Sequence, residues 1–167
     1  MPTSQTGFIE TSRLKLVLQS PGEVRELIDA LGPAEKAELS RDWLGRVEAA
    51  VSADPWIHGF NLFLRVTDVV IGKAGFKGPP GADGAVEIAY YVGPDYEGSG
   101  YATEAAAALT AFAFESGQVR LVRAHTLPES TASQRVLTKC GFRNVGPTVD
   151  PEDGLVWRWE KEQRPAG

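Results

Sequence analysis

The hydrophobic residues of this chain fall into short runs separated by polar turns. A first run, LKLVL at 14–18, predicts an opening strand. Three further runs, at 59–66, 69–76 and 85–92, are rich in β-branched and aromatic residues and are separated by Gly, Pro and Asp. This pattern is typical of a meander of antiparallel strands, with the Gly- and Pro-rich segment 78–84 as a loop.

Two segments between the first strand and the meander have a helical pattern. Residues 22–30 and 33–53 are predicted to be helical because apolar positions recur near the 3.6-residue period. The positions that set this period are Val24, Leu27, Ile28 and Leu31. The domain therefore opens with a strand followed by one or two helices.

Strands and helices alternate after the meander. An alanine-rich helix follows Gly100, and a strand at 121–126 leads to a short helix at 130–139. Two closing strands are predicted at 142–149 and 155–160. This order of elements predicts a mixed α/β fold in which the whole chain forms one domain.

Composition excludes several classes of function. The 17 basic and 22 acidic residues of this 167-residue chain give a net charge of −5, and the basic residues are scattered, so nucleic acid is not expected as a partner. Cys140 is the single cysteine and His58 has no second ligand at metal spacing, so we expect neither a disulfide nor a metal site. No apolar run reaches the length of about 18 residues that a membrane span requires, and no secretory signal pattern begins the sequence. We therefore expect a cytoplasmic protein without a membrane partner.

A glycine-rich turn joins the strand 85–92 to the alanine-rich helix. Gly98 and Gly100 would let a ligand approach the backbone at a helix N-terminus, where unpaired N–H groups favour an anion such as phosphate. A P-loop would need Lys and Ser or Thr after Gly100, where Tyr101 and Ala102 stand instead, and a dinucleotide motif would need a third glycine at Thr103. A tight turn without a ligand remains the alternative for a lone pair of glycines.

Two motifs together resemble the GNAT family of acetyl-CoA-dependent N-acetyltransferases. Residues 97–102 match the family's Gln/Arg-x-x-Gly-x-Gly/Ala motif. A second motif, of the branch related to ribosomal-protein N-terminal acetyltransferases, matches Ser130, Ser133, Val136, Leu137, Lys139, Gly141 and Phe142. The segment 9–21 and the closing LVWRWE also look like that branch. The resemblance implies a single GNAT-type domain over residues 1–167, with a mixed, mostly antiparallel twisted sheet flanked by helices.

The resemblance also implies a site for acetyl-CoA. The pyrophosphate would bind the backbone N–H groups of the glycine turn, and the pantetheine arm would lie along the strand 85–92 like an added strand. The residues expected to bind the cofactor are Tyr90, Tyr91, Val92, Glu97, Gly98, Ser99, Gly100, Tyr101, Ala102 and Ser130. The implied partner is a primary amine, on a small molecule or a protein N-terminus, and the family also allows a homodimer.

Acetyl transfer to an amine requires a base, because an alkyl ammonium group has a pKa of about 10.4 and is protonated at neutral pH. His125 is the preferred candidate, since it stands where some family members carry a glutamate base and histidine changes charge near neutral pH. Glu87 is the second candidate, acting directly or through water. The N–H of Val92 would stabilise the oxyanion, and Ser133 is the remaining hydroxyl that can donate to the leaving thiolate.

Three positions depart from the family pattern. Leu137 replaces a tyrosine that many relatives use as the acid, Glu97 brings an anion near the pyrophosphate, and Ser130 replaces an asparagine. These departures keep a second hypothesis open, namely an acyl-CoA-binding GNAT scaffold without catalytic activity.

Overall fold

The computed structural model describes residues 7–151 and 153–163. The strands are β1 (Phe8–Glu10), β2 (Leu14–Leu18), β3 (Phe60–Leu64), β4 (Val70–Phe76), β5 (Ala85–Val92), β6 (Leu121–Thr126), β7 (Arg143–Asp150) and β8 (Gly154–Glu162). The helices are α1 (Pro21–Asp29), α2 (Pro33–Ala37), α3 (Arg41–Ala49), α4 (Pro55–His58), α5 (Tyr101–Glu115) and α6 (Thr131–Lys139). A short 3₁₀ turn at Pro94–Tyr96 follows β5.

The predicted strands of the meander and the two helices that follow it are confirmed nearly to the residue. One prediction is wrong: residues 33–53 do not form one helix. The hydroxyl of Ser40 accepts a hydrogen bond from the N–H of Trp43 and starts α3, so the segment divides into α2 and α3. The elements β1 and α4 lie outside the prediction, because three or four residues are too few to show a period.

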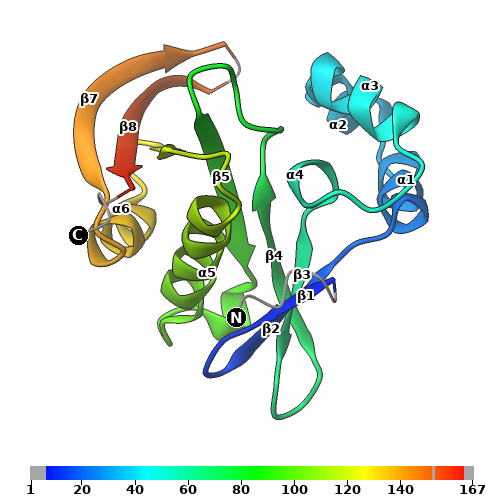
Figure 1. Cartoon of the computed structure of the whole chain (residues 1–167), viewed down its shortest axis with the longest axis horizontal. Helices are drawn as coiled ribbons and strands as arrows, with labels where there is room; N and C mark the ends of the chain where they lie inside the picture. Colours follow the sequence, from blue (N-terminus) through cyan, green and yellow to red (C-terminus); the bar gives the residue numbers. More distant parts are fainter. Residues whose placement is uncertain (1–6, 152, 164–167) are drawn as a thin grey trace.

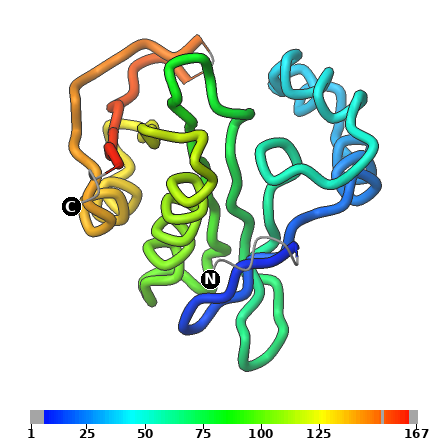
Figure 2. Tube along the Cα trace, in the orientation of Figure 1, coloured from blue at the N-terminus to red at the C-terminus, as the bar shows by residue number. Residues whose placement is uncertain are grey.

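Within the described residues the strands form one sheet in the order β1-β2-β3-β4-β5-β6-β8-β7. Every neighbouring pair is antiparallel except β5 and β6, which run parallel. Figure 1 shows α1 to α3 on one side of the molecule, with α4 beside β4, whereas β7, β8 and α6 lie on the other side and α5 lies across β5 between them. The path of the chain in Figure 2 makes the same division visible.

The helix α5 packs closely on the sheet because its inward face is small. Ala105, Ala106, Leu109 and Ala113 are fully buried in the main core. Alanine side chains let the helix backbone approach the strands, and burial of this apolar face stabilises the packing of α5 on the sheet. The core thereby fixes the start of α5, where the glycine turn lies, against the end of β5.

The parallel strands β5 and β6 separate after a short paired stretch. Their register covers only Ala85 to Glu87 opposite Leu121 to Arg123. Beyond that point β5 stays paired with β4 as far as Val92, and β6 stays paired with β8 as far as Thr126. An open seam therefore runs along β5 from Ile88 to Val92.

Candidate active site

The glycine turn leaves a row of backbone donors without partners. Gly98 and Gly100 have φ angles of +80° and +86°, which side-chain-bearing residues adopt only with strain. In the part of the chain that the structure describes, the N–H groups of Gly98, Ser99 and Gly100 find no backbone or side-chain acceptor. The free N–H groups of the first turn of α5 continue the row, and together they form a site suited to an anion.

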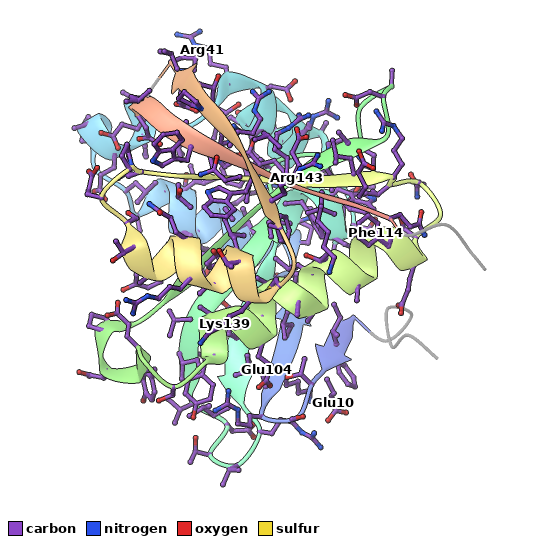
Figure 3. All side chains as sticks on the ribbon, turned by 90° about the vertical axis from the view of Figure 1, so that its left-hand side faces the viewer. Glu10, Arg41, Glu104, Phe114, Lys139 and Arg143 are labelled. Carbon is purple, nitrogen blue, oxygen red and sulfur yellow. The ribbon has the colours of Figure 1, made fainter. Side chains whose placement is uncertain are left out.

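Arg13, in the turn between β1 and β2, contacts the residues that form this site. Its Nη1 donates to the carbonyl oxygen of Ser99 at 2.8 Å, and its guanidinium lies 4.4 Å from the ring centroid of Tyr101. Its Nε also pairs with Glu104 of α5 at 2.9 Å. Figure 3 shows Glu104 near the start of α5, on the side of β1 and β2. The opening strands thus hold the glycine turn in place.

Glu104 joins α5 to the turn between β1 and β2. Partial burial alone would raise its pKa. Hydrogen bonds from the Thr11 hydroxyl and from the N–H and guanidinium of Arg13, together with the Arg13 charge, outweigh burial and lower the pKa below its ordinary value. A carboxylate with a lowered pKa stabilises the fold above the ordinary carboxylate pKa, and that stabilisation is lost as the pH falls through the lowered value.

We expect Glu104→Gln to lower the melting temperature by several degrees near pH 7, because it removes a charged group with three donors. The difference from the wild type should shrink in acid, as the pH falls through the lowered pKa of Glu104. Thermal denaturation followed by circular dichroism measures both. Asp42→Asn, which breaks an exposed pair with Arg46, is the control and should change little. An equal loss of stability near pH 7 and in acid would contradict the role of the charge.

The structure brings the two candidate bases into contact. Oε2 of Glu87 lies 2.8 Å from Nδ1 of His125, although the residues come from different strands. The ammonium of Lys77 lies 3.1 Å from the same oxygen. On the other side of the histidine ring, Nε of Arg158 donates to Nε2 at 3.3 Å. The four side chains form a connected polar cluster at the point where β5 and β6 separate.

The hydrogen bonds of this cluster distinguish the roles of the two residues. Because Nε2 of His125 accepts from Arg158, the ring proton is assigned to Nδ1, which donates to Glu87. Both ring nitrogens are therefore engaged. Oε1 of Glu87 accepts no hydrogen bond from any residue of the described chain, so it is available to a ligand.

Ser133 and Tyr90 meet across the seam. Tyr90 of β5 donates from its hydroxyl to the backbone oxygen of Ser133 on α6 at 3.4 Å. Burial raises the pKa of Tyr90 and keeps its hydroxyl protonated at neutral pH. Leu137, which occupies the position of the missing tyrosine, is fully buried in the core. The hydroxyl of Tyr90 thus links β5 to α6 across the seam.

The remaining predicted cofactor residues line the seam and the turn. Tyr91 is 61% exposed, on the face of β5 opposite to buried Val92. Glu97 is exposed before the glycine turn. Ser130 is the N-cap of α6, although its side chain makes no capping hydrogen bond. Tyr91 thus lies near the end of β5, Glu97 before the glycine turn and Ser130 at the start of α6.

A cleft of about 670 Å³ lies on the opposite face of β4 and β5 from α5. Its floor is one face of the two strands, formed by Lys73, Gly75, Lys77, Glu87, Ala89 and Tyr91. Trp43 of α3 and Ile57 of α4 contribute to one wall, and the hairpin between β7 and β8 contributes Asp150 and Pro151. The volume is in the range of sites for small ligands. Glu87 therefore borders both this cleft and the seam.

The fold, the glycine turn and the motifs agree with a known family. The profile described as "Acetyltransferase (GNAT) domain" matches residues 13–143, most of the chain. The chain belongs to the GNAT acetyltransferase family.

Relatives and solved structures agree with this assignment. The GNAT domain is 33% identical to an uncharacterized N-acetyltransferase, p20, of Bacillus licheniformis over 120 residues, covering 72% of this chain and 67% of p20. The ribosomal L7/L12 α-N-protein acetyltransferase RimL, solved with coenzyme A, has a TM-score of 0.69 at 14% identity and aligns over 93% of this chain and 97% of its own. An aminoglycoside acetyltransferase solved with coenzyme A and kanamycin has a TM-score of 0.66 at 18% identity, over 90% and 95% of the two chains. At these identities the two structures show the shared fold.

Between residues 7 and 163, leaving out 152, no helix is both long and apolar enough to cross a membrane. Over the same residues, no three side chains of His, Cys, Asp or Glu come together as a metal site. His58 is buried, and its Nδ1 accepts a hydrogen bond from the N–H of Asp54.

Sequence reasoning misses the residues that hold the candidates in place. Lys77 could be found by pairing the predicted strands 69–76 and 85–92 as a hairpin, which sets it opposite Glu87. Arg158 and Arg13 carry no such signal, because their partners lie 33 and 86 residues away in the chain. Only the assembled sheet brings them to the site.

Proposed function

We propose that this GNAT domain transfers the acetyl group of acetyl-CoA to a primary amine in the cleft, with Glu87 as the general base. The observation that carries the proposal is the order of features along β5. Glu87 stands where the seam opens, Val92 ends the strand, and the row of free N–H groups follows within ten residues. One strand and the turn after it thereby supply the base, the oxyanion donor and the binding site for the cosubstrate.

Acetyl-CoA is the cosubstrate. Its pyrophosphate would accept hydrogen bonds from the N–H groups of residues 97–102, and its pantetheine arm would pair with β5 at Tyr90, Tyr91 and Val92. Exposed Glu97 can turn its side chain to solvent, so it need not repel the phosphates. Ser130, at the start of α6, would border the arm from the far side of the seam.

In the reaction, the amine nitrogen attacks the thioester carbon and forms the C–N bond. Oε1 of Glu87 takes the proton that the amine loses, directly or through water. His125 holds the carboxylate through Oε2 and is a positioning residue in this scheme. The N–H of Val92 would stabilise the oxyanion until the C–S bond breaks. The hydroxyl of Ser133 or Tyr90 would donate a hydrogen bond to the leaving thiolate, which takes its proton from water while Glu87 returns the amine proton to solvent.

The first test is a titration with acetyl-CoA followed by an acetylation assay. Calorimetry measures binding, and release of free coenzyme A thiol measures transfer to polyamines, amino sugars and short peptides. Binding in the micromolar range with thiol release that depends on an amine supports the proposal. Binding without transfer to any acceptor would favour the inactive acyl-CoA-binding scaffold, and absence of binding would contradict both.

A further inference from the structure

The floor of the cleft has two chemically different ends. At one end, the side chain of Glu87 pairs with that of Lys77. The backbone N–H of Lys77 donates to the carbonyl oxygen of Glu87 at 2.9 Å, so the two residues lie opposite each other. At the other end, Lys73 stands opposite Tyr91. Four residues of extended strand separate the ends, a distance of about 13 Å. Gly75 and Ala89 lie between the two ends, and because they are small they leave space for a ligand above this part of the floor.

Lys73 is the cation of this floor without an anionic partner. Among the residues that the structure describes, its ammonium makes no ion pair, whereas Lys77 is paired with Glu87. The nearest acidic side chains on α1, Glu23 and Glu26, share a smaller depression with Lys73 but lie outside ion-pair distance. Glu23 is engaged instead with the N–H of Ser20 in a capping box.

The ammonium of Lys73 is also held in position. In the amide orientation that satisfies both ends, Gln19 Oε1 accepts from Lys73 Nζ at 3.1 Å, while Nε2 donates to the carbonyl oxygen of His58 at 3.0 Å. By contrast, Glu38, an acidic residue of the cleft at the end of α2, is exposed and makes no ion pair among the described residues. The ammonium of Lys73 is therefore held in position, whereas the carboxylate of Glu38 is not.

His58 adds a second donor to the same region. It lines the cleft and is only 3% exposed. Because its Nδ1 accepts from the N–H of Asp54, the ring proton lies on Nε2, and that atom has no hydrogen-bond partner in the described chain. A buried donor left unpaired costs free energy, and a ligand oxygen that reached Nε2 would recover it.

We infer that the acceptor is a small primary amine whose far end carries an anionic group, a carboxylate or a phosphate. The inference rests on the proposed function and specifies its acceptor. In this acceptor, the amine lies at Glu87 and the anion binds Lys73. Between them, an extended apolar or peptide-like body lies over Gly75 and Ala89, against the wall to which Trp43 contributes. The separation of amine and anion is on the order of 10 Å, the length of about three extended residues or of a chain of eight carbons.

The test compares acceptors that differ only in the terminal charge. One pair is phenylalanyl-glycyl-glycine and its C-terminal amide, and the other is ω-aminooctanoate and its amide. For the wild type we expect kcat/KM to be about fivefold or more higher for each acid than for its amide. Lys73→Gln should reduce the ratio to about one, and Lys73→Glu should invert it. Lys36→Gln removes the same charge from α2 outside the cleft and should keep the preference.

Two further outcomes separate the failure of this inference from the failure of the proposed function. Acetylation of all four compounds without preference for the acids, or a preference that survives Lys73→Gln, overturns the inference while the proposed function stands. If no acetylation occurs, calorimetric titration of each acid and amide into the protein with coenzyme A still decides. Equal affinity of acid and amide overturns the inference, and tighter binding of the acid that requires Lys73 supports it. Preference for the acid in the peptide pair alone would assign the anionic acceptor to peptides.

Discussion

Glu87→Gln should lower kcat for amine acetylation by about a hundredfold to ten-thousandfold, the usual contribution of a general base. Glutamine keeps the size of the side chain and can still accept from Lys77 or His125, but it cannot take the amine proton. The affinity for acetyl-CoA should stay unchanged, because the glycine turn is untouched. Initial rates of thiol release and calorimetry measure the two quantities separately.

The pH profile of the same variant identifies the missing step. An acceptor amine loses its proton without help as the pH approaches its own pKa, about 10.4 for an alkyl amine and about 8 for a peptide N-terminus. The activity of Glu87→Gln should therefore rise toward that of the wild type in alkaline solution. A merely structural defect would not be repaired by raising the pH.

Glu160 offers a matched control for Glu87. Its side chain is 19% exposed against 23% for Glu87, and it pairs with Arg123 on the neighbouring strand. Glu160→Gln should keep kcat within a fewfold of the wild type. If His125→Ala lost as much activity as Glu87→Gln and alkaline pH restored only the histidine variant, His125 would be the base, as the sequence alone suggested.

Gly98→Glu should weaken acetyl-CoA binding by about a hundredfold or more. The change places a side chain in the open space before the free N–H groups, and its carboxylate competes with and repels the pyrophosphate. Calorimetric titration of the folded variant measures the loss. The size follows from removing most of an anion site with several charge-assisted hydrogen bonds.

Gly117, at the other end of α5, is the control for Gly98→Glu. Its φ angle is +76° against +80° for Gly98, and a Cβ added at either glycine would meet nothing within 4 Å. Gly117→Glu therefore carries the same backbone strain and the same added charge, but far from the turn. Equal loss of affinity in both variants would mean that strain, and not the phosphate site, explains the result.

The sequence was sufficient for the elements with strong local signals. The run 85–92 shows its strand pattern at every position, and β5 covers the same residues. Positive φ angles at Gly98 and Gly100 agree with the reason for expecting glycine there. The sequence pattern did not predict that the helical segment 33–53 is interrupted at Ser40. The capping hydrogen bond of the Ser40 hydroxyl acts at one position, and a periodic pattern read over the whole segment does not show it.

The arrangement of the site could be predicted only in part. Motif matches pointed to Glu87 and His125 separately, and neither strand carries a sign that the two side chains touch. The contact depends on the parallel register of β5 and β6, which pairs Glu87 with Arg123 and leaves His125 just beyond the last pair. Likewise Lys73 and Gln19 are 54 positions apart, and they meet only because β2, β3 and β4 lie side by side.

The short pairing of β5 with β6 has a consequence for the stability of the folded chain. Three residue pairs join the half of the sheet that contains β1 to β5 to the half that contains β6, β8 and β7. A pantetheine arm seated in the seam would add the missing strand between the halves, so cosubstrate binding and cohesion of the fold become one equilibrium. Since a ligand that binds only the folded state stabilises it in proportion to the logarithm of its concentration, the supply of acetyl-CoA would set how firmly the two halves hold together.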